Sequence, residues 1–528
     1  LIMKEKVNKN IPEKQPCPIC GEQNRVYQFI LHGAKTSRCP GCGLVTSTNL
    51  EDPDTIQIFA NLAEEKQKPQ TASTGNETEV EANRNYADIL QRKGLASGSR
   101  VLLLADSDHA FLKAGELRGW QITQSKDLTR LDLNTPKGEY DAVVIPYLLE
   151  KQTDPLPFLS KVHDCLKPNG LLLVTVPSLE SPSAKFFGNS WTEWRPENHL
   201  YFDHTTIQLL LWKAGFSGVH LREDKRIYTL AHINDRAREF PGSWITKLIR
   251  ILYTLTPAFL RRTHLRLPSS GIIITARKNE KQKEQTCSFI LPAYNEQATF
   301  NILMEALLAK KLPFGLRKEV VIVESNSQDG TRQQVMEYKD HPEVKIILQE
   351  KAHGKGNAVR EGFNHASGDI LLIQDADLEY DLNDIDLLLE PIASYKIPFV
   401  LGARHGGRVK MRQFSDQQGL STMLNFGHLF FTFLLNLLYG QRLKDPFTMY
   451  KVFRSDCLDG LKFECNRFDF DHELVAKLAR KGYSAIEIPI NYRSRSFKEG
   501  KKIRIFRDPF TWIWALIKFR FVNIYQDE

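Results

Sequence analysis

The sequence lacks an uninterrupted apolar run of about 18 residues, the minimum that marks a membrane-spanning helix. Its nearest approach, LNFGHLFFTFLLNLLY at 424–439, is broken by two asparagines, a glycine and a histidine. The chain begins LIMKEKVNKN with no apolar stretch behind these residues, so we predict no secretory signal peptide. We therefore expect a cytoplasmic protein whose membrane contact is peripheral, at the inner face.

Cysteine is also scarce. The chain has eight cysteines in 528 residues, and four of them fall between positions 17 and 42. Scattered cysteines elsewhere in the chain exclude the disulfide framework of a small secreted domain. The distribution predicts a reducing compartment and a single cysteine metal site.

Neither sign of charge dominates, since 71 Lys and Arg face 63 Asp and Glu, for a net charge of +8. This mild excess suits anionic partners such as phosphates or a lipid surface, but solvated surface charge explains it as well, and we expect no nucleic-acid partner. The length is typical of about three domains. Composition shifts divide the chain into a cysteine-bearing segment, a polar linker, an α/β segment, the charged linker KNEKQKEQT and a second α/β segment, at 1–50, 51–85, 86–277, 278–286 and 287–528.

Both long segments alternate short apolar strands with helical stretches, which predicts α/β domains with parallel sheets. The expected strands of the first are 101–105, 120–124, 140–146 and 171–177. Those of the second are 288–294, 319–325, 344–349, 369–375 and 398–404.

The clustered cysteines form two CxxC pairs, Cys17 with Cys20 and Cys39 with Cys42, and a glycine follows each pair. Two such knuckles place four thiolates around one ion, which suits structural zinc in a closed tetrahedral site. The alternative is four reduced cysteines without metal. We predict a zinc ribbon over residues 1–50 that stabilises the fold.

The first α/β segment carries DAVV from 141, LKPNG from 166, WRPENHLYF from 194 and AGF from 214. With the preceding ribbon, this pattern resembles the class I S-adenosylmethionine-dependent methyltransferases that have an N-terminal zinc ribbon. The resemblance implies a Rossmann-like, methyltransferase-type domain.

The cofactor loop of that family does not match. The first strand leads into ADSDH at 105–109 without the glycine-rich turn that lets a backbone approach the cofactor. The two acidic positions of the family fall on Leu103 and on Gln124 or Ser125. We predict a degenerate domain that does not use S-adenosylmethionine, in which His109 and His199 are structural or solvated.

In the second α/β segment, carboxylates follow the apolar strand DILLIQ at 369–374. Alternate residues of an extended chain point the same way, so Asp375, Asp377 and Glu379 could reach one ion. Hard divalent cations prefer such oxygen ligands and offset the charge of a diphosphate leaving group. We predict a Mg²⁺ or Mn²⁺ site here.

Three further motifs precede these carboxylates. LPAYNE at 291–296 and VIVESNSQDGT at 321–331 end predicted strands, where an α/β sheet binds its ligands. HGKGN at 353–357 is a glycine-rich turn whose backbone could approach a donor, and Lys355 could assist with charge.

These motifs together resemble the family 2 glycosyltransferases with the GT-A fold, and in particular the dolichyl- and polyprenyl-phosphate sugar synthases. The resemblance implies inverting, metal-dependent transfer from a UDP- or GDP-sugar. It implies nucleotide-sugar contacts from Pro292, Ala293, Tyr294, Glu296, Glu324, Lys355 and Asp375. It implies catalytic roles for Asp377, Asp445 and Arg404, the last as a phosphate-binding arginine, and metal contacts from Asp375, Asp377 and Glu379.

The acceptor is less defined, because KDPFTMY at 444–450 departs from the family pattern. A lipid phosphate is already ionised near neutral pH and needs no general base, unlike a sugar hydroxyl. The basic segment with Arg493, Arg495, Lys498 and Lys501 resembles that of the polyprenyl-phosphate enzymes and is a candidate site for the acceptor phosphate, with a solvated surface as the alternative. Segments 424–439 and 506–525 are candidate interfacial helices, with burial in the core as the alternative.

Four hypotheses follow. The first is a glycosyltransferase acting on a polyprenyl phosphate or lipid-linked glycan, and the second is one with another acceptor, such as a surface polysaccharide or a secondary metabolite. The third adds an active methyltransferase that tailors the same product, which binding of S-adenosylmethionine would reveal. The fourth is a non-enzymatic scaffold, and the intact carboxylate motif argues against it.

Overall fold

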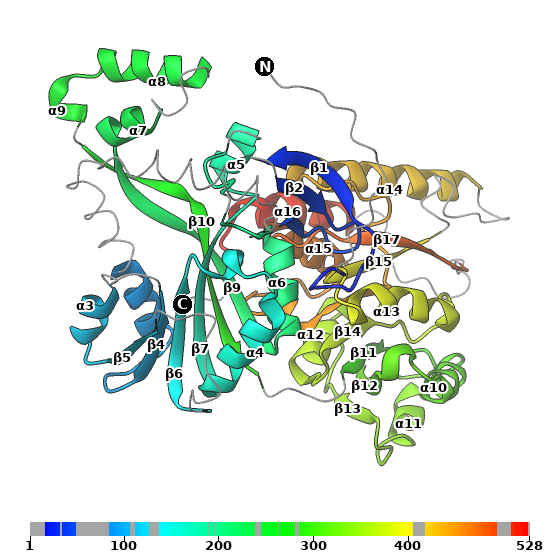
Figure 1. Cartoon of the computed structure of the whole chain (residues 1–528). Helices are drawn as coiled ribbons and strands as arrows, with labels where there is room; N and C mark the ends of the chain where they lie inside the picture. The colour runs from blue at the N-terminus through cyan, green and yellow to red at the C-terminus, as the bar shows by residue number, and fades with distance from the viewer. Residues whose placement is uncertain are drawn as a thin grey trace. The chain divides into compact units, whose positions relative to one another are not determined.

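The computed structural model divides into two compact units, Leu1–Lys281 and Gln282–Glu528 (Figure 1). It describes residues 16–31, 34–48, 84–105, 111–125, 137–188, 191–195, 197–237, 244–261, 263–279, 285–404, 418–493 and 508–525.

The first unit is built on a six-stranded sheet in the order β5-β4-β6-β7-β10-β9. Its strands are β4 (Arg100–Leu104), β5 (Gln121–Ser125), β6 (Tyr140–Pro146), β7 (Leu166–Pro177), β9 (Phe216–Thr229) and β10 (His264–Lys278). Strands β5, β4, β6 and β7 are parallel, and β10 lies antiparallel between β7 and β9. The apolar runs of β4, β6 and β7 are buried, as expected for parallel strands covered on both faces.

Helices connect these strands. They are α3 (Phe111–Glu116), α4 (Pro155–Cys165), α5 (Pro182–Phe187), α6 (His204–Lys213), α7 (Leu230–Ala237), α8 (Trp244–Leu255) and α9 (Ala258–Arg261), and residues 84–92 are also helical. Asp203 and Thr206 form a capping box that fixes the start of α6. The helical residues Tyr86 and Leu90 join β4 and β6 in one apolar cluster.

The cysteine ribbon belongs to this first unit. Its strands β1 (Val26–Leu31), β2 (Ala34–Arg38) and β3 (Val45–Thr48) are completed by β8 (Leu200–Tyr201), which comes from the methyltransferase-like segment. The Lys213 ammonium donates to the Ile19 carbonyl oxygen across the same junction. The ribbon and the α/β segment therefore share a sheet.

The second unit contains a seven-stranded sheet in the order β13-β12-β11-β14-β16-β15-β17. Its strands are β11 (Thr286–Ala293), β12 (Arg317–Glu324), β13 (Val344–Leu348), β14 (Ile370–Ile373), β15 (Phe399–Arg404), β16 (Lys451–Arg454) and β17 (Ile486–Ile490). Strands β13, β12, β11 and β14 are parallel, whereas β16 runs antiparallel to both β14 and β15. The antiparallel pairings of this sheet begin at β16, which lies between β14 and β15 although it follows both of them in the chain.

The helices of the second unit are α10 (Phe300–Ala309), α11 (Thr331–Met336), α12 (Lys355–His365), α13 (Ile385–Ala393), α14 (Gln418–Tyr439), α15 (Phe470–Arg480) and α16 (Asp508–Phe521). The predicted fold class is confirmed, since each expected strand of both α/β segments overlaps an observed one. Of the helices that the structure describes, none combines the length and the hydrophobicity required to cross a bilayer.

Candidate functional site

Three parallel strands of the second unit end at one edge of its sheet. The register aligns Ala293 at the end of β11 with Glu324 at the end of β12, and it aligns Ile290 with Ile373 of β14. Segments 294–296, 325–331 and 374–379 therefore leave the sheet at the same, carboxyl edge. Ligands of open α/β sheets bind at such an edge, so the motifs predicted from the sequence meet where a ligand site is expected.

The loops after β11 and β12 are tied to each other. The Asn295 backbone N–H donates to the Ser327 hydroxyl at 3.0 Å, and the Gln328 N–H donates to the Asn295 side-chain oxygen at 2.9 Å. Asn295 and Asn326 have φ angles of 52° and 57°, a left-handed conformation that asparagine tolerates better than most residues. The two loops thus form one preorganised rim.

Glu324 organises this rim from within. Its side chain is fully buried, pairs with the Arg332 guanidinium at 2.6 Å and accepts the Ser327 backbone N–H at 2.7 Å. The two carboxylate oxygens are therefore engaged by the loop that follows β12 and by α11. In this conformation, Glu324 shapes the rim of the predicted nucleotide site.

The other predicted nucleotide contacts differ in accessibility. Ala293 is buried, Pro292 and Glu296 are half-buried, and the Tyr294 side chain is 39% exposed at the edge. The Glu296 backbone N–H donates to the Thr331 hydroxyl at 2.9 Å, which joins this segment to the start of α11. Of these four residues, Tyr294 offers the most surface to a planar base.

Asp375 and Lys355 form an ion pair at the same edge. Lys355 is the first residue of α12, and Asp375 lies just beyond β14. Burial by itself lowers the pKa of Lys355, but Asp375 and Asp471 outweigh it and leave the pKa raised. The lysine is thus a fixed cation beside the predicted metal carboxylates, suited to contacting a phosphate.

The glycines on either side of Lys355 serve a packing role. Gly354 has a φ angle of 105°, and a Cβ there would lie 2.4 Å from the Asn466 carbonyl oxygen. A Cβ on Gly356 would lie 2.5 Å from the Phe470 Cβ. Glycine is required because α12 approaches the backbone near the start of α15. The sequence predicts that these glycines let the donor come close to the backbone. In the structure, the atoms that come close to them belong to residues 465–470 of the chain itself.

Asp377 and Glu379 occupy different surroundings from Asp375. Asp377 is 5% exposed and accepts the Glu379 backbone N–H at 3.0 Å. The Glu379 carboxylate accepts the Tyr492 hydroxyl at 2.7 Å. Within the described ranges, the carboxylates of the acidic motif do not gather as a three-ligand cluster. Asp375 and Asp377 are nevertheless hard oxygen donors of the type that Mg²⁺ and Mn²⁺ prefer.

Arg404 and Asp445 form a buried bidentate pair. The Arg404 Nε and Nη2 atoms donate to the two Asp445 oxygens at 2.9 and 2.7 Å, and the Arg404 backbone N–H adds a third bond at 2.9 Å. Burial alone would raise the pKa of Asp445, but the Arg404 guanidinium outweighs it and lowers the pKa. Asp445 is fully buried, so this pair holds β15 against the 444–450 segment.

Two buried side chains of the second unit, a lysine and a histidine, could not be recognised as site residues from the sequence. The Lys451 ammonium is fully buried, donates to the Asp471 carboxylate at 2.7 Å and also reaches the Thr448 carbonyl oxygen. His472 is stacked between the rings of Phe447 and Trp512, and burial lowers its pKa to about 3, so it is neutral. An isolated lysine or histidine on α15 or β16 gives no sequence signal, because its partners are remote in the chain.

Only one member of the predicted acceptor-phosphate set can be placed. Arg493 is exposed, and its backbone N–H donates to the Glu379 carbonyl oxygen at 2.9 Å, so the basic segment begins beside the acidic motif. Arg495, Lys498 and Lys501 lie outside the described residues.

In the first unit, the four predicted cysteines gather as a group able to hold a metal ion. Their sulfurs are 3.5 Å apart for Cys17 and Cys42 and 3.4 Å apart for Cys20 and Cys39. Sulfurs around a tetrahedral zinc are about 3.8 Å apart, given a Zn–S bond of about 2.3 Å. The arrangement therefore fits a tetrahedral ion with four thiolate ligands.

The methyltransferase-like sheet carries a buried polar cluster where β6 ends. The Tyr147 hydroxyl donates to the Asp224 carboxylate at 2.7 Å, and Arg226 Nε pairs with the same oxygen at 3.0 Å. Leu103 is fully buried in β4, and the Gln124 amide donates to the Ala105 carbonyl oxygen at 3.4 Å. The loop at 106–110, with His109, lies outside the described residues. His199 is half-buried, and burial lowers its pKa.

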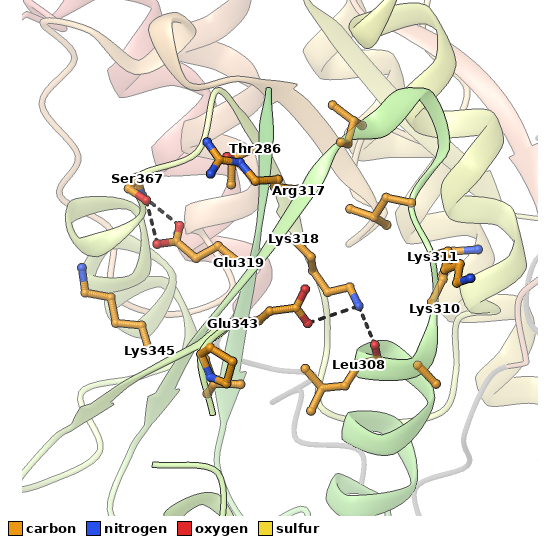
Figure 2. Close-up of a pocket in the computed structure, with 15 residues that line it drawn as sticks. Thr286, Leu308, Lys310, Lys311, Arg317, Lys318, Glu319, Glu343, Lys345 and Ser367 are labelled. Carbon is orange, nitrogen blue, oxygen red and sulfur yellow. Dashed lines mark hydrogen bonds and ion pairs between the residues drawn. The ribbon is translucent and has the colours of Figure 1, made fainter. Parts of the chain in front are cut away.

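A groove of about 1030 Å³ lies at the opposite edge of the second sheet (Figure 2). It is lined by residues such as Thr286 at the start of β11 and Lys318 and Glu319 near the start of β12. Lys318 donates to the Leu308 carbonyl oxygen at 2.7 Å and pairs with Glu343 at 3.6 Å. The length of β12 separates this groove from the acidic motif by roughly 23 Å, so it is not part of the predicted donor site.

Comparison with known families agrees with this arrangement. Residues 288–461 match the model of glycosyl transferase family 2, and residues 59–221 match a methyltransferase domain model. The C-terminal unit thus contains a family 2 glycosyltransferase domain, and the N-terminal unit a methyltransferase-type domain, as predicted.

Among curated proteins, the chain is similar to the dolichol-phosphate mannosyltransferase of Pyrococcus furiosus, with 27% identity over 216 residues, 40% of this chain and 58% of that protein. It is also similar to the undecaprenyl-phosphate 4-deoxy-4-formamido-L-arabinose transferase of Edwardsiella ictaluri, with 26% identity over 220 residues, 41% of this chain and 63% of that protein. The chain therefore spans about three-fifths of the length of these relatives.

Among solved structures, glucosyl-3-phosphoglycerate synthase from Mycobacterium tuberculosis in complex with uridine diphosphate matches with 21% identity and a TM-score of 0.34, over 45% of this chain and 81% of that one.

Proposed function

We propose that the C-terminal unit transfers a sugar, with inversion, from a UDP- or GDP-sugar to a polyprenyl phosphate or a lipid-linked glycan. The observation that carries this proposal is the family 2 domain whose acidic motif follows β14 at the carboxyl edge, with Lys355 paired to Asp375. In the reaction, an acceptor oxygen attacks the anomeric carbon as the nucleoside diphosphate leaves.

A divalent cation, Mg²⁺ or Mn²⁺, would neutralise charge on the departing diphosphate. Asp375 and Asp377 would hold it, with Glu379 near them. Lys355 would then contact the diphosphate. Tyr294 and the rim organised by Glu324 would bind the base and ribose.

Arg404 is assigned a positioning role within the catalytic set. Its guanidinium is engaged by Asp445 and lies 5.2 Å from the centre of the Tyr492 ring, and the Tyr492 hydroxyl in turn donates to Glu379. The chain Asp445–Arg404–Tyr492–Glu379 would orient the acidic motif from β15. Contact of Arg404 with a phosphate would require partial release from Asp445.

The acceptor assignment rests on two features. Both curated relatives are named for transfer to a lipid phosphate. The basic segment that begins at Arg493 starts beside Glu379, which suits an anionic acceptor entering from that side. A phosphate acceptor needs no general base. This agrees with the surroundings of His472, which is neutral but enclosed by aromatic rings and so cannot reach an acceptor as a base.

Peripheral membrane contact is part of the same proposal. Helices α14 and α16 expose large aromatic side chains, among them Phe426, Phe433, Phe510, Trp514 and Phe521. Interfacial helices present such faces to the boundary between headgroups and acyl chains. All eight cysteines are unbridged, which is in keeping with a cytoplasmic location.

The test is donor turnover by the purified full chain with Mg²⁺ or Mn²⁺, a panel of UDP- and GDP-sugars, and a short polyprenyl phosphate in detergent. Consumption of one donor only when the lipid phosphate is present is the expected result. Turnover that does not depend on the lipid phosphate but requires a sugar or a metabolite would show that the acceptor is one of these instead. Absence of donor binding with either metal would refute the transferase.

The methyltransferase-type match favours a second candidate, a bifunctional enzyme that also methylates. We propose instead that this domain does not use S-adenosylmethionine and that the four cysteines hold structural zinc. Support comes from the apolar Leu103 and the neutral Gln124 at the family's acidic positions. Calorimetric binding of S-adenosylmethionine to the full chain would establish the bifunctional alternative.

A further inference from the structure

An amphipathic helix stands at the end of a long β-ribbon in the first unit. Strands β9 and β10 remain paired from Phe216 with Lys278 to Thr229 with His264, and α7, α8 and α9 lie between them in the chain. Figure 1 shows these three helices, in green, gathered beyond the far end of the ribbon. They are therefore held away from the sheet that forms the body of this unit.

Helix α8 exposes a continuous apolar stripe. Leu248, Ile251, Leu252 and Leu255 follow the i, i+3, i+4, i+7 spacing of one helix face, and each is between 46% and 76% exposed. Leu260, Leu265 and Leu267 add exposed leucines after the helix. Contiguous exposed apolar residues of this kind mark an interaction surface, since isolated ones are common but a stripe is not.

The surroundings of the stripe are basic. Lys247 and Arg250 are exposed on the polar side of α8. The sequence from 240 to 270 contains Lys247, Arg250, Arg261, Arg262 and Arg266 and no aspartate or glutamate. Helix α7, which packs against α8, adds one acidic and one basic residue, Asp235 and Arg236, so the excess of cations remains. An apolar stripe with an excess of cations complements a surface that is apolar inside and negatively charged outside.

The helical tip is also built to keep its shape. The Arg261 guanidinium lies 4.6 Å from the centre of the Tyr253 ring and donates to the Thr256 and Thr254 carbonyl oxygens at 2.8 and 3.1 Å. These bonds satisfy carbonyl groups at the end of α8, which would otherwise need water or another cap. The stripe is thus a preformed face on a capped helix.

We propose that α8 docks on an anionic lipid surface, with its leucine and isoleucine stripe in the headgroup boundary and its lysine and arginine side chains at the phosphates. This is the arrangement of an interfacial amphipathic helix. A second copy of the chain fits less well, because an isologous contact would bring the same cations together. The inference goes beyond the proposed reaction, since it assigns a membrane contact to the unit that carries no transferase motif.

The experiment is co-sedimentation of the full chain with vesicles of phosphatidylcholine alone or mixed with phosphatidylglycerol. The wild type should partition to the mixed vesicles, and more weakly at high salt. The double substitution Ile251→Glu/Leu252→Glu should lower partitioning about tenfold or more, because it places charge in the apolar boundary. Lys247→Glu/Arg250→Glu should lower it on anionic vesicles by a similar factor.

Leu117→Glu is the matched control, because Leu117 is 75% exposed and lies beside α3. It should bind vesicles like the wild type. The vesicle concentration is kept below saturation, so that binding through α14 or α16 does not hide the loss. Wild-type partitioning by both α8 variants would overturn the inference, as would an α8 variant that changes only the oligomeric state.

Turnover with a short polyprenyl phosphate in detergent separates the two proposals. The α8 variants should retain it, because no vesicle is involved. Vesicle binding that depends on α8 in a chain without any donor turnover would refute the proposed function and leave this inference standing. Turnover with no vesicle binding would do the reverse.

Discussion

At the residue scale, three aspartates of the C-terminal unit have chemically identical side chains in different surroundings. Asp445 is fully buried against Arg404, Asp375 pairs with Lys355, and Asp377 accepts a backbone N–H of its own motif. The sequence placed all three in a catalytic or metal-binding set. Their environments separate them, because a carboxylate locked to a guanidinium is a structural anion, whereas one at a strand edge can accept a cation.

Asp377→Asn tests the metal assignment. The substitution keeps the shape of the side chain but removes a charged oxygen ligand, so metal-dependent donor turnover should fall by about 100-fold or more. Initial rates over a series of Mn²⁺ concentrations measure the loss. Asp340→Asn, at an 88% exposed side chain of the same unit, should have no effect. Full activity of Asp377→Asn would refute its role.

Asp445→Asn tests the buried pair through stability and its pH dependence. It leaves Arg404 buried without its counter-charge, which should cost about 3–5 kcal/mol at neutral pH. The pKa of Asp445 is lower in the folded chain, so its contribution is present above the unfolded value of about 3.9 and is lost as the pH falls through the folded value.

The difference in stability between wild type and Asp445→Asn should therefore be large at pH 7 and shrink in acid. Hydrogen–deuterium exchange of β15 and β16 at several pH values measures it. A difference that is constant with pH would mean that Asp445 is not the titrating group.

At the scale of elements, the start of α12 shows how a helix is positioned by contacts on both sides. Lys355 reaches Asp375 only because Gly354 and Gly356 let the helix approach residues 466–470. From the sequence, the same glycines were expected to admit a donor. The difference arises because a glycine pattern reports close approach without identifying what approaches.

Gly354→Ala should displace the first turn of α12. Its φ angle of 105° is unfavourable for alanine, and the new Cβ would collide with the Asn466 carbonyl oxygen. Donor turnover should fall about tenfold or more, because Lys355 moves with the turn. Gly427→Ala in α14, where a Cβ meets nothing within 4 Å, should leave turnover unchanged and stabilise by up to about 1 kcal/mol. Equal turnover in both variants would contradict this role of Gly354.

At the scale of the whole molecule, two units of different character share one chain. The first combines a cysteine ribbon, a methyltransferase-type sheet and the β9–β10 ribbon with α8 at its end. The second carries the transferase motifs. Because β8 completes the sheet of the cysteine ribbon, loss of metal should loosen the methyltransferase-type domain as well as the ribbon.

Cys39→Ser should therefore lower the melting temperature of the first unit while leaving turnover per folded molecule in the second unit nearly unchanged. The physical reason is that a structural zinc contributes folding free energy where its ligands lie. Calorimetry resolves the melting of the units, and metal analysis checks that zinc is lost. Cys165→Ser, outside the metal group, should retain zinc. Lost turnover in a stable Cys39→Ser protein would show that the ribbon has a role in the reaction.

The sequence by itself determined the features that are local in the chain. Apolar runs specified β11, β12 and β14, the CxxC spacing specified the cysteine group, and the order of motifs specified a family 2 domain. Each follows from periodicity or short spacing, which the chain carries without reference to its fold.

Only the tertiary structure decided the pairings between remote segments. Arg404 with Asp445, Lys451 with Asp471, and β8 with the cysteine ribbon join residues that are 20 to more than 150 positions apart. The sequence does not reveal whether a single charged residue or a short apolar segment is buried, because its partner lies far away in the chain. Burial and charge pairing therefore became visible only when the sheets brought these segments together.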